Sequence, residues 1–414
     1  MTATDRPEAN PQGNADTPSV ALDRALAGEL ERRAAADLLR RRPLVDSGHG
    51  PVMRIDGRRV INFCGNDYLG LASAPAGRQA LRQASRTGVG AGASHLINGH
   101  HRAHHRLEDA LAEFVGRPRA LLFSSGYLAN LGVISALVGR GDWVFQDRLN
   151  HACLLDGAVL SRAPMRRYRH CDVQDLQGRL AASAGRRRLV VSDGVFSMDG
   201  DLAPLPKLAA ACRDADAWLM IDDAHGLGVL GPRGRGSCEH FGMTRAEVPI
   251  LVGTLGKAFG GSGAFVAASE TVIEYLIQTA RPYIYTTAMP APVAAATAAN
   301  VARAVRESWR RARLHAWIQR FRSGARELGI PLLPSDSAIQ PVPIGEAADA
   351  LAASQSLLQH GLFVMAIRPP TVPRGTARLR ITLSARHRAS QIDRLLEVLD
   401  RTLPPTTRQA MPRH

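Results

Sequence analysis

The feature that most constrains the fold is an alternation of short apolar segments with helical segments over residues 105–268. The short segments are apolar at successive positions, as in strands that are buried on both faces of a sheet. Helices are expected at 105–116, through 130–138 and at 206–214. The sequence therefore predicts an α/β fold with a mostly parallel central sheet covered by helices. The predicted strands are 120–124, 143–146, 188–192, 218–222, 250–254 and 264–268.

Outside this region the pattern changes towards both ends of the chain. An amino-terminal helix is expected over 21–42, where Pro43 ends it, and a hairpin over 52–63 turns at Asp56-Gly57. After residue 300 the pattern becomes that of a smaller α+β domain, with helices at 301–328, 346–360 and 389–399 and strands at 339–342, 364–367 and 379–382. The chain thus divides into a disordered tail (1–20), a helix-and-hairpin arm (21–60), a large domain (61–300), a small carboxy-terminal domain (301–402) and a loose tail (403–414).

The charge balance bears on possible partners. The chain has 52 basic and 37 acidic residues, a formal net charge of +15. The basic residues are spread along the chain, without a basic tail, an aromatic-interleaved stripe or zinc-finger spacing, so we expect no nucleic-acid partner. A basic nucleic-acid-binding protein stays open as the non-enzyme alternative. Only two of the basic residues are lysines, Lys207 and Lys257, so amine chemistry has only two candidates.

Targeting signals and cysteines indicate the compartment. We find no apolar run near the roughly 20 residues that cross a bilayer, and residues 1–20 lack the apolar block of a signal peptide. The five cysteines are odd in number and widely spaced, which favours reduced thiols over a disulfide framework. We therefore expect a cytoplasmic protein without membrane association.

The segment Leu251–Ala264 carries the strongest chemical signal. An apolar strand ends at Thr254, and Lys257 follows inside a glycine-rich turn. A lysine held in this way beside a strand end suits imine formation with a carbonyl cofactor, whereas the alternative is a lysine in a surface loop.

A second strand, Trp218–Asp222, delivers Asp222 and Asp223 to its carboxyl end, with His225 close behind. A buried carboxylate there can keep the pyridine nitrogen of pyridoxal phosphate (PLP) protonated, and His225 can hydrogen-bond the phenolic oxygen of that ring. The alternatives are a metal site and a nucleotide site. Gly226–Gly231 matches G-x-G-x-x-G, but Pro232 follows where a dinucleotide site needs a helix.

Further polar residues follow other strands of the predicted sheet. Gly126 and Tyr127 begin a helix whose backbone N–H groups can bind phosphate, with Ser124 or Ser125 nearby. His151 follows the strand 143–146 and can stack on a planar ring. Asp193 and Ser197 follow the strand 188–192 and can face the same site. Each of these signals alone also fits an ordinary loop or helix start.

Four histidines lie close together at His100, His101, His104 and His105. Their helical spacing could bind zinc, but no carboxylate or cysteine convincingly completes a ligand set. We therefore expect solvated or capping roles for them and no metal.

Taken together, these motifs resemble the α-oxoamine synthases, PLP enzymes of fold type I that condense an amino acid with an acyl thioester. The resemblance runs from about Asp37 to about Leu399. The matching segments are NDYLGL (66–71), NHACLLDG (150–157), DGVFSMDGD (193–201), DDAHGLGVLG (222–231), GTLGKAFG (253–260) and AIRPPTVPRGTARLRITL (366–383).

The resemblance implies a role for each matched position. Lys257 matches the lysine that forms the imine with PLP, and His151 matches the catalytic residue that stacks on the ring and also contacts substrate. Asp222 and His225 match the partners of the pyridine nitrogen and the phenolic oxygen. Other cofactor contacts are implied for Gly126, Tyr127, Ser197, Thr254 and, from the neighbouring subunit, Thr286 or Thr287. Substrate contacts are implied for Arg40, Asn66, Arg368, Thr371 and Arg380.

Two details refine the resemblance. Arg380 looks like the clamp for the amino-acid carboxylate, for which a planar guanidinium is well shaped. Asp193 stands where the family often has glutamate, so its carboxylate reaches less far.

The segment Ile367–Pro373, IRPPTVP, bears on the substrate. It resembles the enzymes of biotin biosynthesis that condense L-alanine with a pimeloyl thioester more than the sister enzymes that use glycine. The resemblance further implies a homodimer with a shared active site, and a thioester carried by coenzyme A or by an acyl carrier protein. A glycine-using sister enzyme and a PLP aminotransferase stay open as alternatives.

Overall fold

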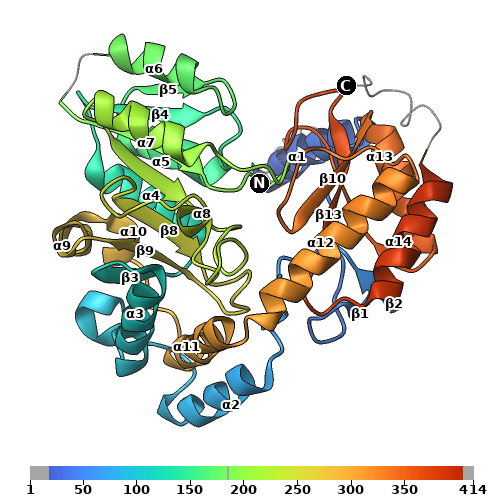
Figure 1. The fold of residues 1–414 in the computed structure, drawn as a ribbon, viewed down its shortest axis with the longest axis horizontal. Helices are drawn as coiled ribbons and strands as arrows, with labels where there is room; N and C mark the ends of the chain where they lie inside the picture. The colour runs from blue at the N-terminus through green and yellow to red at the C-terminus, as the bar shows by residue number, and fades with distance from the viewer. Residues whose placement is uncertain (1–17, 184–185, 404–414) are drawn as a thin grey trace, which may run out of the picture. The chain divides into compact units, whose positions relative to one another are not determined.

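A computed structural model describes residues 18–183 and 186–403 and divides the chain into two compact units, residues 1–43 and 44–414 (Figure 1). The predicted tails fall almost wholly on residues 1–17 and 404–414, which lie outside the described residues. The predicted boundary between residues 300 and 301 stays a prediction.

The described part of the first unit contains one helix, α1 (Pro18–Ala35), followed by a turn and extended chain. The helix ends seven residues before the predicted end at 42, so that prediction was wrong. Asp37 takes the left-handed conformation, with φ of 56°, which a continuing right-handed helix does not allow. No residue of α1 is buried, and Leu22, Leu26 and Leu30, spaced for one face, are all exposed.

The centre of the second unit is a seven-stranded sheet in the order β3-β9-β8-β7-β6-β4-β5. The neighbours from β8 to β5 are parallel, whereas β9 runs antiparallel to both β3 and β8. The mostly parallel sheet is therefore confirmed. The strands are β3 (Arg119–Phe123), β4 (Trp143–Asp147), β5 (Met165–Tyr168), β6 (Arg188–Asp193), β7 (Trp218–Asp222), β8 (Ile250–Thr254) and β9 (Ala264–Ala268).

Helices cover both faces of this sheet, because successive strand residues point to opposite faces. Val144 and Val191 pack in one apolar cluster with α4, α5 and α9, while Phe145 and Val190 pack in another with α6 and α7. The helices around the sheet are α2 (Pro75–Ala84), α3 (Arg102–Val115), α4 (Gly126–Leu137), α5 (Ala152–Ser161), α6 (Val173–Ala181), α7 (Leu205–Asp214), α8 (Ser237–His240), α9 (Glu270–Thr279) and α10 (Arg281–Ile284). A 3₁₀ turn (Ser85–Thr87) and a π-helical turn, η2 (His95–Gly99), precede α3.

The carboxy-terminal part of this unit has two smaller sheets. An antiparallel sheet has the order β10-β13-β12, and the predicted hairpin pairs with a third strand in the order β1-β2-β11. One helix was predicted over 301–328, but the structure has two, α11 (Ala291–Arg306) and α12 (Trp309–Glu327). The helical conformation is interrupted at residues 307–308. The other elements are β1 (Val52–Ile55), β2 (Arg58–Asn62), β10 (Ile339–Gly345), α13 (Ala347–Gln359), β11 (Leu362–Phe363), β12 (Met365–Ile367), β13 (Ala377–Thr382) and α14 (Ala389–Thr402).

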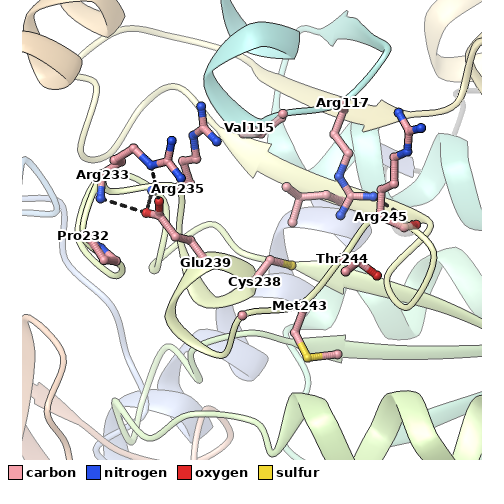
Figure 2. A pocket seen from close by; sticks show the side chains of 13 residues that line it. Val115, Arg117, Pro232, Arg233, Arg235, Cys238, Glu239, Met243, Thr244 and Arg245 are labelled. Atoms are coloured by element: carbon pink, nitrogen blue, oxygen red, sulfur yellow. Dashed lines mark hydrogen bonds and ion pairs between the residues drawn. The ribbon is translucent and has the colours of Figure 1, made fainter.

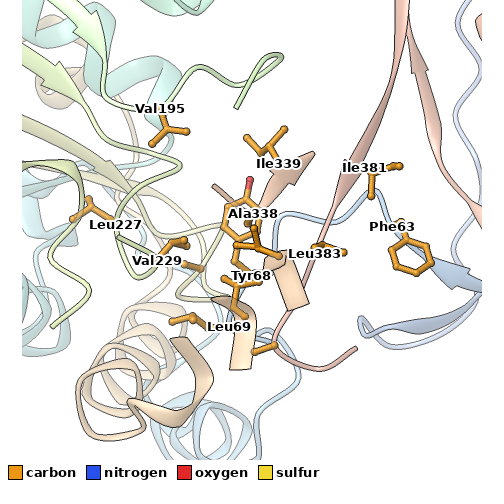
Figure 3. Packing of buried hydrophobic residues seen from close by; sticks show 14 of the residues in the cluster. Phe63, Tyr68, Leu69, Val195, Leu227, Val229, Ala338, Ile339, Ile381 and Leu383 are labelled. Carbon is orange, nitrogen blue, oxygen red and sulfur yellow. The ribbon is translucent and has the colours of Figure 1, made fainter. Parts of the chain in front are cut away.

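One apolar cluster joins this part to the residues around the central sheet. Figure 3 shows Tyr68 and Leu69 between Val229 of the large sheet's loops and Leu383 beyond β13. Tyr68 is fully buried although it carries a hydroxyl, so that hydroxyl needs a hydrogen-bond partner. No helix among the described residues has the length and apolarity to cross a membrane.

We predict that Phe265→Ala lowers the free energy of unfolding by about 3–5 kcal/mol, because it empties a fully buried position on β9, between β3 and β8. Denaturant unfolding of the wild type and the variant measures the change. Val159→Ala, at a side chain that is 68% exposed, should change the free energy by less than about 0.5 kcal/mol. Equal effects of the two substitutions would contradict the described packing.

Candidate active site

The carboxyl ends of β6, β7 and β8 bring the main candidate residues together. The parallel register pairs Asp193 with Asp222 across β6 and β7. Lys257 lies three residues beyond the end of β8, the next strand in the sheet. Asp193 and Asp222 are buried, with 3% and 6% of their surfaces exposed. Two carboxylates and one amine therefore share a poorly solvated edge of the sheet.

Lys257 is partly buried, and its Nζ lies 2.8 Å from Nε2 of His225. Burial lowers the pKa of Lys257 to about 8, although the charges of Asp222 and Asp193 oppose the shift. Near neutral pH the unprotonated amine, which is the form that attacks a carbonyl carbon, is therefore far more populated than in an ordinary lysine.

His225 continues a chain of hydrogen bonds away from Lys257. Its Nδ1 lies 2.7 Å from the hydroxyl of Tyr68, which donates to Oδ1 of Asn66 at 3.1 Å. Because the tyrosine proton goes to Asn66, the hydroxyl accepts from Nδ1–H, and Nε2 keeps a lone pair towards Lys257. Burial, and secondarily the charge of Lys257, lowers the pKa of His225 well below its ordinary value, so the ring is neutral.

Arg380, a buried residue of β13, completes this chain. Its guanidinium donates to the carbonyl oxygen of Ser197 at 2.6 Å and to Oδ1 of Asn66 at 3.4 Å. The contacts join β13 to the loop after β6 and to Asn66, so predicted cofactor and substrate residues share one network. Tyr68 stands within the segment NDYLGL but was not among the predicted site residues, because its contact with His225 spans 157 positions.

Asp222 is held in place by two donors. Nδ2 of Asn130 donates to Oδ2 at 2.6 Å, and the backbone N–H of Ala224 donates to Oδ1 at 3.0 Å. Asn130 is fully buried in α4. The sequence predicts a helix through Asn130 but has no local signal for its contact with Asp222, which is 92 positions away.

His151 lies at the start of α5, where its Nδ1 accepts from the N–H of Cys153 at 3.3 Å. Its own backbone N–H donates to Oδ2 of Asp193 at 2.7 Å. The aspartate at position 193 is therefore long enough to hold the His151 backbone. Burial lowers the pKa of His151, opposed by the charge of Asp222 and reinforced by that of Lys257.

The phosphate-binding candidates lie at the start of α4. Gly126 and Tyr127 are its first two residues, and Ser125 caps it by accepting from the N–H of Leu128 at 3.2 Å. A side chain at Gly126 would meet nothing within 4 Å, so space is open beside these N–H groups. The hydroxyl of Ser124 donates to the carbonyl of Thr287 at 3.3 Å, which places Thr287 of the same chain beside the end of β3.

For the remaining predicted site residues, the contacts described here do not include Lys257, Asp222 or His225. Thr254 donates its hydroxyl to the carbonyl of Gly263 at 3.3 Å in the turn that holds Lys257. Arg368 and Thr371 share a turn after β12, closed by a backbone hydrogen bond of 3.1 Å. Thr286 is half-buried after α10. Arg40 is exposed and belongs to the first unit. The substrate and phosphate roles of these residues stay predictions.

Two pockets differ in their relation to this site. One, of about 460 Å³, is lined by Asn66 and by Gly256, the residue before Lys257. The other, of about 510 Å³, is lined by Arg117, Arg233, Arg235 and Arg245 and contains none of the predicted site residues (Figure 2). The first pocket therefore borders the candidate active site at Asn66 and at the turn that holds Lys257, and the second lies apart from it.

These residues fit the groups of PLP. Lys257 offers a partly neutral amine for the aldehyde, Asp222 a fixed carboxylate for the pyridine nitrogen, and the start of α4 offers N–H donors for the phosphate. The G-x-G-x-x-G match at Gly226–Gly231 leads into turns, not into a dinucleotide-binding helix, as its sequence predicted.

The chain is similar to known proteins over most of its length. The family described as aminotransferase class I and II matches residues 58–399. An 8-amino-7-oxononanoate synthase of Nitrosococcus oceani is 59% identical over 376 residues, covering 91% of this chain and all of the relative. Another from Methylococcus capsulatus is 60% identical over 379 residues, covering 91% of this chain and 98% of the relative. The structure of a serine palmitoyltransferase from S. paucimobilis with bound PLP superposes with a TM-score of 0.88 at 31% identity, covering 93% of this chain and 98% of that one.

We predict that the Lys257 amine of the PLP-free protein titrates near pH 8 instead of near 10.5. Reductive methylation with ¹³C-formaldehyde followed by NMR at increasing pH measures this pKa. In a Lys207→Arg background Lys257 is the only lysine left, so its signal needs separating only from that of the α-amine. A midpoint near 10.5 would contradict the burial described for the side chain.

Proposed function

The chain belongs to the class I and II aminotransferase family of PLP enzymes, and within it to the α-oxoamine synthases; we propose that it condenses L-alanine with a pimeloyl thioester to 8-amino-7-oxononanoate. The observation that carries the proposal is the 59–60% identity with 8-amino-7-oxononanoate synthases over 91% of the chain. The product belongs to biotin biosynthesis, and the chain is a PLP-dependent, decarboxylating C-acyltransferase.

Each residue of the site has a separate role in the proposed reaction. Bound PLP supplies an electron sink for the charge that develops at Cα of alanine. Arg380 holds the alanine carboxylate, and its bonds to Ser197 and Asn66 fix the orientation of the guanidinium. Lys257 removes the proton from Cα, for which an amine with a pKa near the working pH is well suited. Asp222 holds a proton at the pyridine nitrogen, and Asn130 keeps its carboxylate in place.

The bond changes follow in order. Cα of alanine attacks the thioester carbonyl, a C–C bond forms, and the thiol leaves with the electrons of the C–S bond. The carboxylate held by Arg380 then leaves as CO₂, and a proton returned to Cα completes the amino ketone. Lys257 is positioned for both proton transfers at Cα, and His225 keeps the lysine amine oriented between them.

The proposal extends to the choice of amino acid, the thioester carrier, the assembly and the compartment. The segment Ile367–Pro373 favours L-alanine over glycine, and the thioester is carried by coenzyme A or by an acyl carrier protein. The family resemblance, in which Thr286 or Thr287 matches the position that reaches the phosphate of the neighbouring subunit, supports a homodimer with a shared active site. The five cysteines are free thiols, which supports a reducing compartment such as the cytoplasm.

The decisive experiment measures thiol release by the PLP-loaded protein, with L-alanine and glycine crossed against pimeloyl-, succinyl- and acetyl-CoA. We expect release that requires both L-alanine and pimeloyl-CoA. Release with glycine and a short thioester would move the chain to a glycine-using sister enzyme. If all pairs fail, the same assay with a pimeloyl-loaded acyl carrier protein tests the second carrier, and failure there too would overturn the proposal.

We predict that Lys257→Ala lowers kcat by at least about 10³-fold, because both proton transfers at Cα lose their carrier. Lys207→Ala, which removes the other lysine from an exposed position on α7, should leave kcat within about twofold of the wild type. Comparable activity of the two variants would rule out the role of Lys257.

We predict that Tyr68→Phe lowers kcat/KM for L-alanine by about 5- to 100-fold, because Nδ1 of the buried His225 and Oδ1 of Asn66 both lose a partner. KM for the thioester serves as the internal control and should change little. A kcat/KM equal to that of the wild type would show that the chain of hydrogen bonds from Lys257 to Arg380 does not matter for catalysis.

A further inference from the structure

Outside the candidate active site, three groups of ligand-type side chains converge within the described residues. They are His95, His100 and His104; His100, His105 and Glu108; and Asp147, His170 and Cys171. A metal ligand needs a lone pair that no other contact occupies, so the existing hydrogen bonds decide which group can bind an ion.

The first and third groups fail this test. His104 donates from Nε2 to the carbonyl of Met289 at 2.7 Å, and its Nδ1 accepts from the N–H of His101 at 2.8 Å. His170 lies between two carboxylates, with Nδ1 2.9 Å from Asp147 and Nε2 2.8 Å from Asp201, so both nitrogens carry protons. Neither ring has a lone pair to offer.

The second group has the geometry of a metal site. Nε2 of His100 lies 3.9 Å from Oε2 of Glu108, and one ligand atom of each of the three residues lies within 4.8 Å of the others. Ligands bound to Zn²⁺ at about 2.1 Å in a tetrahedron lie about 3.4 Å apart. The side chain of His105 is 68% exposed, and its Nε2 lies 3.8 Å from Oδ2 of Asp109, which is beyond hydrogen-bond distance, so the ring can rotate towards an ion. The side chain of Glu108 is 13% exposed and fixed.

Neighbouring residues orient the two fixed ligands. Nδ1 of His100 lies 3.0 Å from Nδ1 of His95, and the ring of His95 stacks on Tyr283 at 5.1 Å between centroids. If Nδ1–H of His100 donates to His95, Nε2 presents its lone pair towards Glu108. The other oxygen of Glu108 accepts from the N–H of Leu122 at 3.0 Å, which leaves Oε2 for an ion.

We propose that His100, His105 and Glu108 form a zinc site in which water takes the fourth position. His105 and Glu108 are three residues apart on α3 and therefore lie on one face of that helix. His100 comes from the chain directly after η2, so the ion ties this turn to α3. The expectation of capping roles holds for His101 and His104, and Glu108 is the carboxylate that the histidine pattern did not reveal.

Equilibrium dialysis of the full-length, PLP-loaded protein against Zn²⁺, with metal analysis, tests the proposal. We expect one tight Zn²⁺ per chain, and an absorption spectrum of tetrahedral Co²⁺ when Co²⁺ replaces it. His105→Gln and Glu108→Gln should each abolish that tight binding. His95→Phe keeps a ring beside Tyr283 but removes the acceptor for His100, so it should weaken binding by about 10- to 100-fold.

His240→Gln, at an exposed histidine of α8, is the matched control and should bind Zn²⁺ like the wild type. Circular dichroism of each variant shows that it is folded. Stoichiometric binding that persists in folded His105→Gln and Glu108→Gln variants would overturn the proposal, as would the lack of tight binding in the wild type. Neither result depends on whether the protein accepts L-alanine.

Discussion

The site depends on one electrostatic constraint: two buried carboxylates and one lysine share the carboxyl edge of a parallel sheet. The register of β6 and β7 sets Asp193 beside Asp222, and the turn after β8 adds Lys257. Burial raises the pKa of Asp193 well above its ordinary value, and the neighbouring charge of Asp222 raises it further. The same burial lowers the pKa of Lys257. A poorly solvated edge thus prepares both an acid and a base without a strained backbone.

Hydrogen bonds connect Lys257 to a residue of a second sheet. From Lys257 the contacts run through His225, Tyr68 and Asn66 to Arg380, which belongs to a different sheet. Tyr68 and His225 are buried, and Arg380 also donates to the carbonyl oxygen of Ser197, so the lysine and the guanidinium keep a defined relation. In the proposed reaction, this arrangement presents the amine of Lys257 and the guanidinium of Arg380 to the amino acid in one orientation.

The sequence alone predicts the parts of this account that depend on local pattern. The apolar segments predicted both ends of β8 and β9 correctly. Lys257, Asp222 and His225 were predicted because they are polar residues that follow the ends of strands. Contacts between segments that are far apart in the chain could not be predicted from the sequence. Tyr68 and His225 are 157 residues apart, and Asn130 and Asp222 are 92 apart, so neither pair has a local signal. The helix break at 307–308 and the end of α1 at Ala35 depend on single backbone conformations that periodicity does not encode. Glu108 became a candidate ligand only when folding buried it beside His100.

The most direct test of the account follows the carboxyl carbon of the amino acid. The PLP-loaded protein is given L-[1-¹³C]alanine and pimeloyl-CoA, or the pimeloyl carrier protein if that is the active thioester, and ¹³CO₂ and free thiol are measured together. Decarboxylative condensation predicts one ¹³CO₂ for each thiol released, with no pyruvate. Formation of ¹³C-labelled pyruvate without thiol release would instead show amino transfer, and would contradict the account of Lys257 and Arg380 as the base and the carboxylate clamp of an acyl transfer.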